Sequence, residues 1–113
     1  MLFRSDGGKA RFAAADLSDP AQLDELAEQV GAVDILVNNA GISWFGPTGE
    51  LDVATFDRLF AANVRAPYFL VAALAPKMAA RGSGSIINIG SQAGHVGMPG
   101  GRSEEHTSEL QSL

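Results

Sequence analysis

Two short apolar segments of this chain have the pattern of strands buried on both faces of a parallel sheet. Residues 33–37 and 85–89 are rich in Val, Ile and Leu and lack a strict polar alternation, which is typical of such strands. Small and polar residues follow at once, Asn-Asn-Ala-Gly at 38–41 and Gly-Ser at 90–91. Ligands of open α/β sheets bind outside the carboxyl ends of the strands. The pattern therefore predicts one wall of a ligand site, with an ordinary strand-to-loop turn as the alternative.

The segment before the first of these strands predicts a helix over residues 20–30. Its apolar residues form one stripe at i, i+3, i+4 and i+7: Leu23, Leu26, Ala27 and Val30. Asp19 followed by Pro20 is typical of an N-cap and first helical residue, and Gly31 is typical of a helix end. Because residues 10–15 predict a further short strand, the order is strand, helix, strand, a βαβ unit with a right-handed crossover.

A long helix is predicted over residues 52–81, where apolar residues recur at helical spacing. Asn63 lies among these apolar positions, and Pro67 follows four residues later. A proline clashes with the carbonyl group four residues before it, so the helix should be irregular around Asn63. The freed carbonyl could bind a water molecule, or the kink could carry no chemistry. In the loop before this helix, Trp44 and Phe45 either line a substrate pocket or pack the loop down.

The composition narrows the class of protein. The chain has 113 residues, of which 46% are hydrophobic and 19% charged, and these values fit one small globular domain. The lack of cysteine excludes disulfides and thiolate metal sites, and two histidines at this spacing predict no metal site. A net charge of −5 without a basic cluster argues against nucleic acid. No apolar run suits a membrane span and no signal peptide is evident. We therefore expect a cytoplasmic protein without a membrane partner.

Four motifs, in this order and spacing, resemble the central part of the short-chain dehydrogenase/reductase family, in its classical branch, over residues 10–101. They are Asp-Leu at 16–17, Asp-Ile-Leu-Val-Asn-Asn-Ala-Gly at 34–41, Ala-Asn-Val at 62–64 and Gly-Ser-Ile-Ile-Asn-Ile-Gly-Ser at 84–91. The resemblance implies an α/β fold, a partial Rossmann-like doubly wound parallel sheet that holds strands 3, 4 and 5 of the family. Residues 1–101 would form this partial NAD(P)-binding domain.

The implied activity is hydride transfer between NAD or NADP and a small-molecule carbonyl or alcohol. The resemblance assigns Asp16 and Leu17 to the adenine ring. It also assigns Asn39, Ala40 and Gly41 to the ribose side of the cofactor. Two positions would be catalytic: Ser91 would donate a hydrogen bond to the reacting oxygen, and the carbonyl of Asn63 would order a water that relays protons.

Two departures from the family pattern suggest an inactive fragment. The Gly-rich turn that cradles the pyrophosphate is absent before residue 10. The family's Tyr and Lys would fall at 104 and 108, where this chain has Glu104 and Ser108. Residues 102–112 look like a translated sequencing adapter, so we expect residues 102–113 to be an artefactual tail. Alternatives are a non-catalytic NAD(P)-binding or regulatory relative, and a sugar-nucleotide epimerase or dehydratase on the same scaffold.

The resemblance also predicts how an incomplete sheet behaves. Family strand 3 (about 11–15) would be separated from strand 4 by two missing strands, a gap of roughly 14 Å. The segment should therefore stay unpaired or collapse beside strand 4. The uncovered sheet predicts aggregation. By analogy with the family, the parent protein would be a homo-oligomer that associates through the long helix 52–81.

Overall fold

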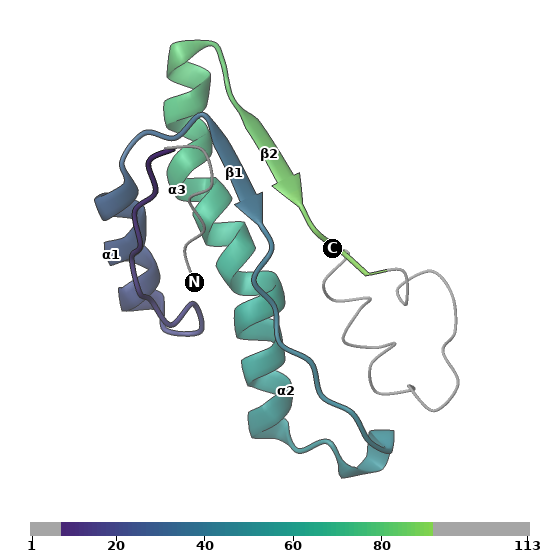
Figure 1. Ribbon diagram of the computed structural model, residues 1–113. Helices are drawn as coiled ribbons and strands as arrows, with labels where there is room; N and C mark the ends of the chain where they lie inside the picture. The colour runs from purple at the N-terminus through teal and green to yellow at the C-terminus, as the bar shows by residue number, and fades with distance from the viewer. Residues whose placement is uncertain (1–7, 92–113) are drawn as a thin grey trace.

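The computed structural model describes residues 8–91, which form a small parallel sheet covered by helices (Figure 1). The elements in chain order are α1 (Pro20–Val30), β1 (Ile35–Asn38), the 3-10 turn η1 (Thr48–Glu50), α2 (Val53–Phe60), the π-helical segment η2 (Ala61–Arg65), α3 (Ala66–Arg81) and β2 (Ser85–Asn88). The predicted tail at residues 102–113 lies outside the described residues.

Helix α1 begins and ends where its capping residues predict. The carboxylate of Asp19 accepts a hydrogen bond from the backbone N–H of Ala21, and Pro20 occupies the first turn, where a missing N–H costs nothing. Gly31 follows the helix with a φ of 64°, a conformation that glycine adopts without steric cost. Leu23 and Ala27 from the predicted stripe are buried.

The long helix predicted over residues 52–81 is present, and it is irregular at the predicted place. Asp52 caps its start, and α2, η2 and α3 then continue one another without a break from Val53 to Arg81. The π-helical turns of η2 surround Asn63, four residues before Pro67. Because Pro67 has no backbone N–H and crowds the preceding turn, a locally wider helix relieves the conflict. Gly82, with a φ of 73°, ends the helix.

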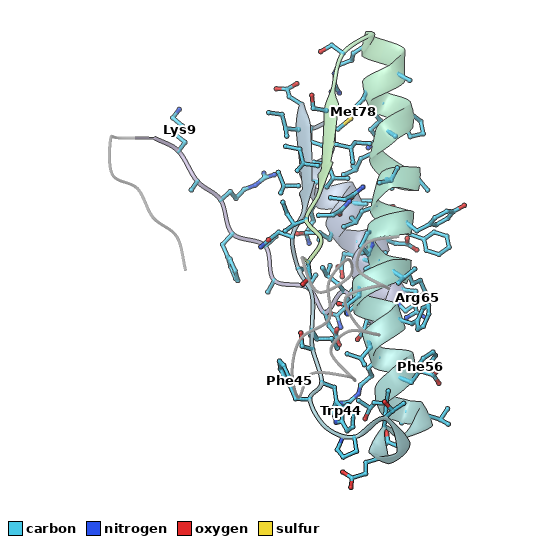
Figure 2. All side chains as sticks on the ribbon, turned by 90° about the vertical axis from the view of Figure 1, so that its right-hand side faces the viewer. Lys9, Trp44, Phe45, Phe56, Arg65 and Met78 are labelled. Atoms are coloured by element: carbon cyan, nitrogen blue, oxygen red, sulfur yellow. The ribbon has the colours of Figure 1, made fainter. Side chains whose placement is uncertain are left out.

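Strands β1 and β2 pair in parallel, as the two apolar segments predicted. The register joins Ile35 to Ser85 and continues to Asn38 opposite Asn88. Residues 10–15, predicted as a strand, form none. The prediction of a third strand in the partial sheet is therefore wrong for this structure. In the part of the chain that is described, the sheet holds β1 and β2 only, so residues 10–15 stay unpaired and do not collapse beside β1. A strand needs a neighbour for its backbone hydrogen bonds, and Figure 2 shows the segment at Lys9 well away from the sheet.

Helix α1 and the long helix Val53–Arg81 lie on the same face of this sheet. The core joins Leu23 of α1 to Ala66 and Leu70 of α3, with Leu36 of β1 packed against them. Figure 2 shows the strands along one side of the long helix. On the opposite face of the sheet, Ile35, Val37 and Ile87 are 60%, 51% and 46% exposed.

The helix Val53–Arg81 is also long and apolar enough, by length and composition alone, to cross a membrane. The sequence, which has no uninterrupted apolar run of that length, did not predict that this helix would meet the criterion. A buried core helix meets the same criterion, and Ala66, Leu70, Leu74 and Met78 of α3 are buried at four-residue spacing. Their burial accounts for the apolar composition of that helix face.

Candidate functional site

The carboxyl ends of β1 and β2 meet at a cavity of about 620 Å³ against the long helix. The predicted wall residues Asn39, Ala40 and Gly41 all line it. The remaining lining residues come from the strand ends and the helix: Asn38, Asn63, Val64, Pro67, Tyr68, Val71, Ala72, Asn88, Ile89 and Gly90. The lining thus combines small residues with the amides of four asparagines, Asn38, Asn39, Asn63 and Asn88, an arrangement typical of ligand sites.

An amide pair holds the two strand ends together. Asn38 Nδ2 donates to Asn88 Oδ1 at 2.9 Å, and the backbone N–H of Ile89 donates to the carbonyl of Asn38 at 2.9 Å. Asn88 is the residue directly opposite Asn38 in the register. This side-chain bond adds to the backbone bond at the end of the ladder, directly before residues 39–41 leave the sheet.

Asn63 connects the long helix to the loop that follows the wall. Its Oδ1 accepts from the backbone N–H of Ile42 at 2.9 Å, and its Nδ2 donates to the carbonyl of Ile42 at 2.8 Å. The side chain is buried, with 5% of the residue exposed. The sequence drew attention to the backbone carbonyl of Asn63 and missed these side-chain bonds. A buried amide in an apolar helix stripe was the available signal, but its partner lies 21 positions away in the chain.

Asp16 and Leu17 form a compact turn before α1. Asp16 Oδ1 accepts from the backbone N–H of Ser18 at 3.0 Å and from its hydroxyl at 2.6 Å. The hydrogen bond from the Ser18 hydroxyl, and to a smaller extent that from its backbone N–H, hold the pKa of the Asp16 carboxyl below its ordinary value. The group is therefore ionised at neutral pH. Leu17 is half-buried against the core of α1 and α3. The turn is therefore ordered, with a charged side chain on its exposed surface.

Ser91 follows β2 at the same end of the sheet as residues 39–41, and it is half-buried. Its neighbour Gly90 lines the cavity. Because β1 and β2 pair in parallel, Ser91 leaves the sheet at the same edge as Asn39 and Gly41, and its hydrogen bond to a reacting oxygen stays a prediction. His95, His106, Glu104 and Ser108 lie outside the described residues.

The two aromatic residues of the loop differ in environment. The ring of Trp44 lies over Gly46, where an added Cβ would come within 2.9 Å of it. Trp44 is half-buried, whereas Phe45 is 65% exposed. Trp44 therefore packs the loop against itself, and neither ring is among the residues that line the cavity. In residues 8–91, the acidic and His side chains form no group that could hold a metal ion.

A parallel β-α-β arrangement with a cavity at the carboxyl ends of its strands, lined by small residues and amides, is typical of nucleotide-binding α/β proteins. A family model described as short chain dehydrogenase matches residues 2–103. This chain belongs to that family.

Curated and solved relatives agree with this membership. The chain is 38% identical over 100 residues to an uncharacterised oxidoreductase of Thermotoga maritima and 43% identical over 96 residues to sorbitol dehydrogenase of Cereibacter sphaeroides. These matches cover 87% and 80% of this chain but 40% and 38% of those proteins. A metagenomic short-chain oxidoreductase solved in complex with NADP superimposes with a TM-score of 0.83 at 40% identity, over 94% of this chain and 50% of that one.

Proposed function

We propose that this chain is part of an NAD(P)-dependent oxidoreductase that transfers a hydride between the nicotinamide cofactor and a small-molecule carbonyl or alcohol. The observation that supports this most is the cavity at the strand ends, lined by Asn39, Ala40, Gly41 and Asn63. The protein would be cytoplasmic. Because the chain spans about 40% of its curated relatives, this activity is proposed for the whole protein.

The described residues fit one side of a dinucleotide. The small side chains of Ala40 and Gly41 leave backbone accessible for a flat ring or a ribose, and Asn39 beside them offers a donor and an acceptor. The ionised carboxylate of Asp16 would accept a hydrogen bond from the adenine amino group, with Leu17 against the ring. These residues would hold the cofactor, and bound NAD or NADP would supply or accept the hydride.

At the reacting end, the Ser91 hydroxyl would donate a hydrogen bond to the substrate oxygen and stabilise its developing charge. The backbone carbonyl of Asn63 would order a water for proton transfer, while its side chain fixes Ile42. The chain carries no Tyr-x-x-x-Lys after Ser91. We therefore propose that these 113 residues bind the cofactor without turning over substrate, which also keeps a non-catalytic NAD(P)-binding function as the second candidate.

The outer surface of the long helix supports the proposal that the parent protein is a homo-oligomer through residues 52–81. Four large apolar side chains on it are 44% to 76% exposed: Val53, Phe56, Tyr68 and Phe69. The rings of Phe56 and Phe60 are tilted by 45° with centroids 4.8 Å apart, and Tyr68 contacts Phe69 edge-on with centroids 5.1 Å apart. A second copy of the helix would remove this apolar surface from water.

A chimera tests the function. Residues 10–91 would replace the corresponding segment of the sorbitol dehydrogenase of Cereibacter sphaeroides, and NAD(P)H formation would be followed by absorbance. We expect the chimera to turn over, and Ser91→Ala to lower kcat by about 100-fold or more with cofactor KM nearly unchanged. Ser83→Ala, in the exposed turn after α3, is the control. A folded chimera that binds neither NAD nor NADP would refute the proposal.

A further inference from the structure

The π-helical segment η2 contacts two separate loops of the site. Asn63 bonds both backbone groups of Ile42, in the loop after β1. Two residues later, the guanidinium of Arg65 donates from Nη2 to the backbone carbonyl of Ser18, in the turn before α1, at 2.5 Å. Figure 2 labels Arg65 on this helix. Side chains two positions apart on a helix do not share a face, so one short segment reaches both loops at once.

The turn that Arg65 contacts is a closed hydrogen-bonded unit. The carboxylate of Asp16 holds Ser18 through both its N–H and its hydroxyl, and the N–H of Asp19 donates to the carbonyl of Asp16 at 3.1 Å. The backbone N–H of Asp16 donates to Gln22 Oε1 at 2.8 Å. These hydrogen bonds join Ser18, whose carbonyl Arg65 contacts, to the Asp16 carboxylate within one turn.

Arg65 uses its charge on this carbonyl and not on a carboxylate. Within residues 8–91, the ion pair of the structure is Arg81 with Asp34, at the other end of the long helix. Next to Arg65, Ala66 is fully buried against Leu23 and Leu70, and Leu17 packs on the same cluster. The backbone that carries Arg65 is therefore packed into the core next to its side chain.

We propose that Arg65 is a positioning residue for the adenine end of the cofactor site. It fixes the turn 16–19 to η2, and Asn63 fixes the loop after Gly41 to the same segment. The turn that would contact the adenine ring and the loop that follows the ribose-side wall are in this way held at one separation. This inference rests on the proposed function, because it takes Asp16 and Leu17 as the adenine contacts.

The test uses the 113-residue chain in dilute solution, with Arg65→Gln, the rescue variant Arg65→Lys and the control Arg58→Gln. Arg58 is on the preceding helix and donates only locally, to the Thr55 hydroxyl. Hydrogen exchange of the peptide that contains residues 16–19 reports the turn. Equilibrium dialysis of AMP reports adenine binding. We expect Arg65→Gln to speed exchange in the turn and to raise the AMP Kd, each by about five- to tenfold, and Arg65→Lys to restore part of both.

The outcomes separate this inference from the proposed function. Exchange and AMP affinity unchanged in Arg65→Gln would overturn the role of Arg65, as would equal losses in Arg58→Gln. An Arg65→Gln variant with a loosened turn but unchanged AMP affinity would overturn it too, since the residue would then be structural only. If AMP does not bind the unaltered chain, the assignment of Asp16 and Leu17 to the adenine ring fails, and the inference that rests on it fails with it. Faster exchange in Arg65→Gln would then show only that Arg65 stabilises the turn.

Discussion

The side chain of Asn63 forms two hydrogen bonds with the backbone of a single residue, Ile42, one donated and one accepted, at 2.8 and 2.9 Å. An amide can satisfy a backbone N–H and a C=O in this way as a strand neighbour would. The loop after β1 is thereby joined to the long helix, and within residues 8–91 it forms no strand. The geometry makes Asn63 a structural anchor, whatever further part its carbonyl plays in chemistry.

Replacing Asn63 with Leu keeps the number and branching of the side-chain heavy atoms and removes both bonds. The backbone N–H and C=O of Ile42 lose these two hydrogen bonds. Because Ile42 is 44% exposed, we expect a loss of about 1–3 kcal/mol in the free energy of unfolding. Urea titration of the dilute chain, followed by the fluorescence of Trp44, its single tryptophan, measures this. Gln29→Leu, an exposed amide on α1, is the control and should change stability by less than about 0.5 kcal/mol. Equal effects of the two substitutions would contradict the anchor role.

The pair Asn38–Asn88 should behave as a coupled unit. We expect Asn38→Ala and Asn88→Ala each to destabilise the chain, and the double variant to cost less than their sum by about 1 kcal/mol, since the bond between them can be lost only once. A double-mutant cycle from urea titrations gives the coupling free energy. A coupling near zero would mean that the contact contributes nothing to stability.

Gly84 has no room for a side chain. A Cβ built there would come within 2.6 Å of Met78 Cβ and 2.5 Å of Met78 Cγ, atoms close to the helix backbone that have little freedom to move. Gly84→Ala should therefore cost about 1–3 kcal/mol through overpacking between α3 and β2. Gly49→Ala, where a Cβ meets nothing within 4 Å, is the matched control. Thermal unfolding by circular dichroism compares them, and a Gly84→Ala variant as stable as the Gly49→Ala variant would show that the α3–β2 connection adapts freely.

The open face of the sheet should drive self-association. Ile35 and Ile87 are apolar and exposed on the face opposite the helices, where Ile87 pairs with Val37 in the register. The outer edges of the two described strands are unpaired. We expect light scattering to rise with concentration, and the double variant Ile35→Thr/Ile87→Thr to reduce it while the helices remain. Leu36→Thr, on the helix-covered face, should instead unfold the chain. If the double variant scatters light as strongly as the unaltered chain, self-association does not occur through this face of the sheet.

The start of the long helix should be sensitive to acid. Asp52 accepts from the backbone N–H of Thr55 at 2.7 Å. The hydrogen bonds from the Thr55 side chain and backbone hold the pKa of Asp52 below its ordinary value of 3.8. Because the pKa of Asp52 is lower in the folded state than in the unfolded state, its ionised carboxylate stabilises the fold at pH values above the unfolded-state pKa. This stabilisation is lost as the pH falls through the folded-state pKa. The protection factors of amide hydrogens at the start of α2, which correct exchange rates for their intrinsic pH dependence, should therefore fall below about pH 4. Asp52→Asn, which caps without titrating, should remove that dependence; a persistent acid transition would implicate another group.

Local chemistry in the sequence determined the elements and their order. Asp19, Pro20 and Gly31 bounded the first helix, the clash that Pro67 causes located the irregular turn, and the two apolar runs identified the strands. These signals act between residues close in the chain, so they can be read without a structure. The motifs of residues 16–91 likewise indicated the family.

The tertiary structure decided the contacts between distant residues. Whether residues 10–15 become a strand depends on a partner to receive their hydrogen bonds, and the described chain supplies none. That Asn63 holds Ile42, that Asn38 meets Asn88 and that Arg65 reaches Ser18 depend on how α1, β1 and the long helix pack. The wall at Asn39, Ala40 and Gly41 was predicted from its residues. What holds this wall in position is a set of side-chain bonds across 21 to 50 positions of the chain, a distance over which neither propensity nor periodicity carries information.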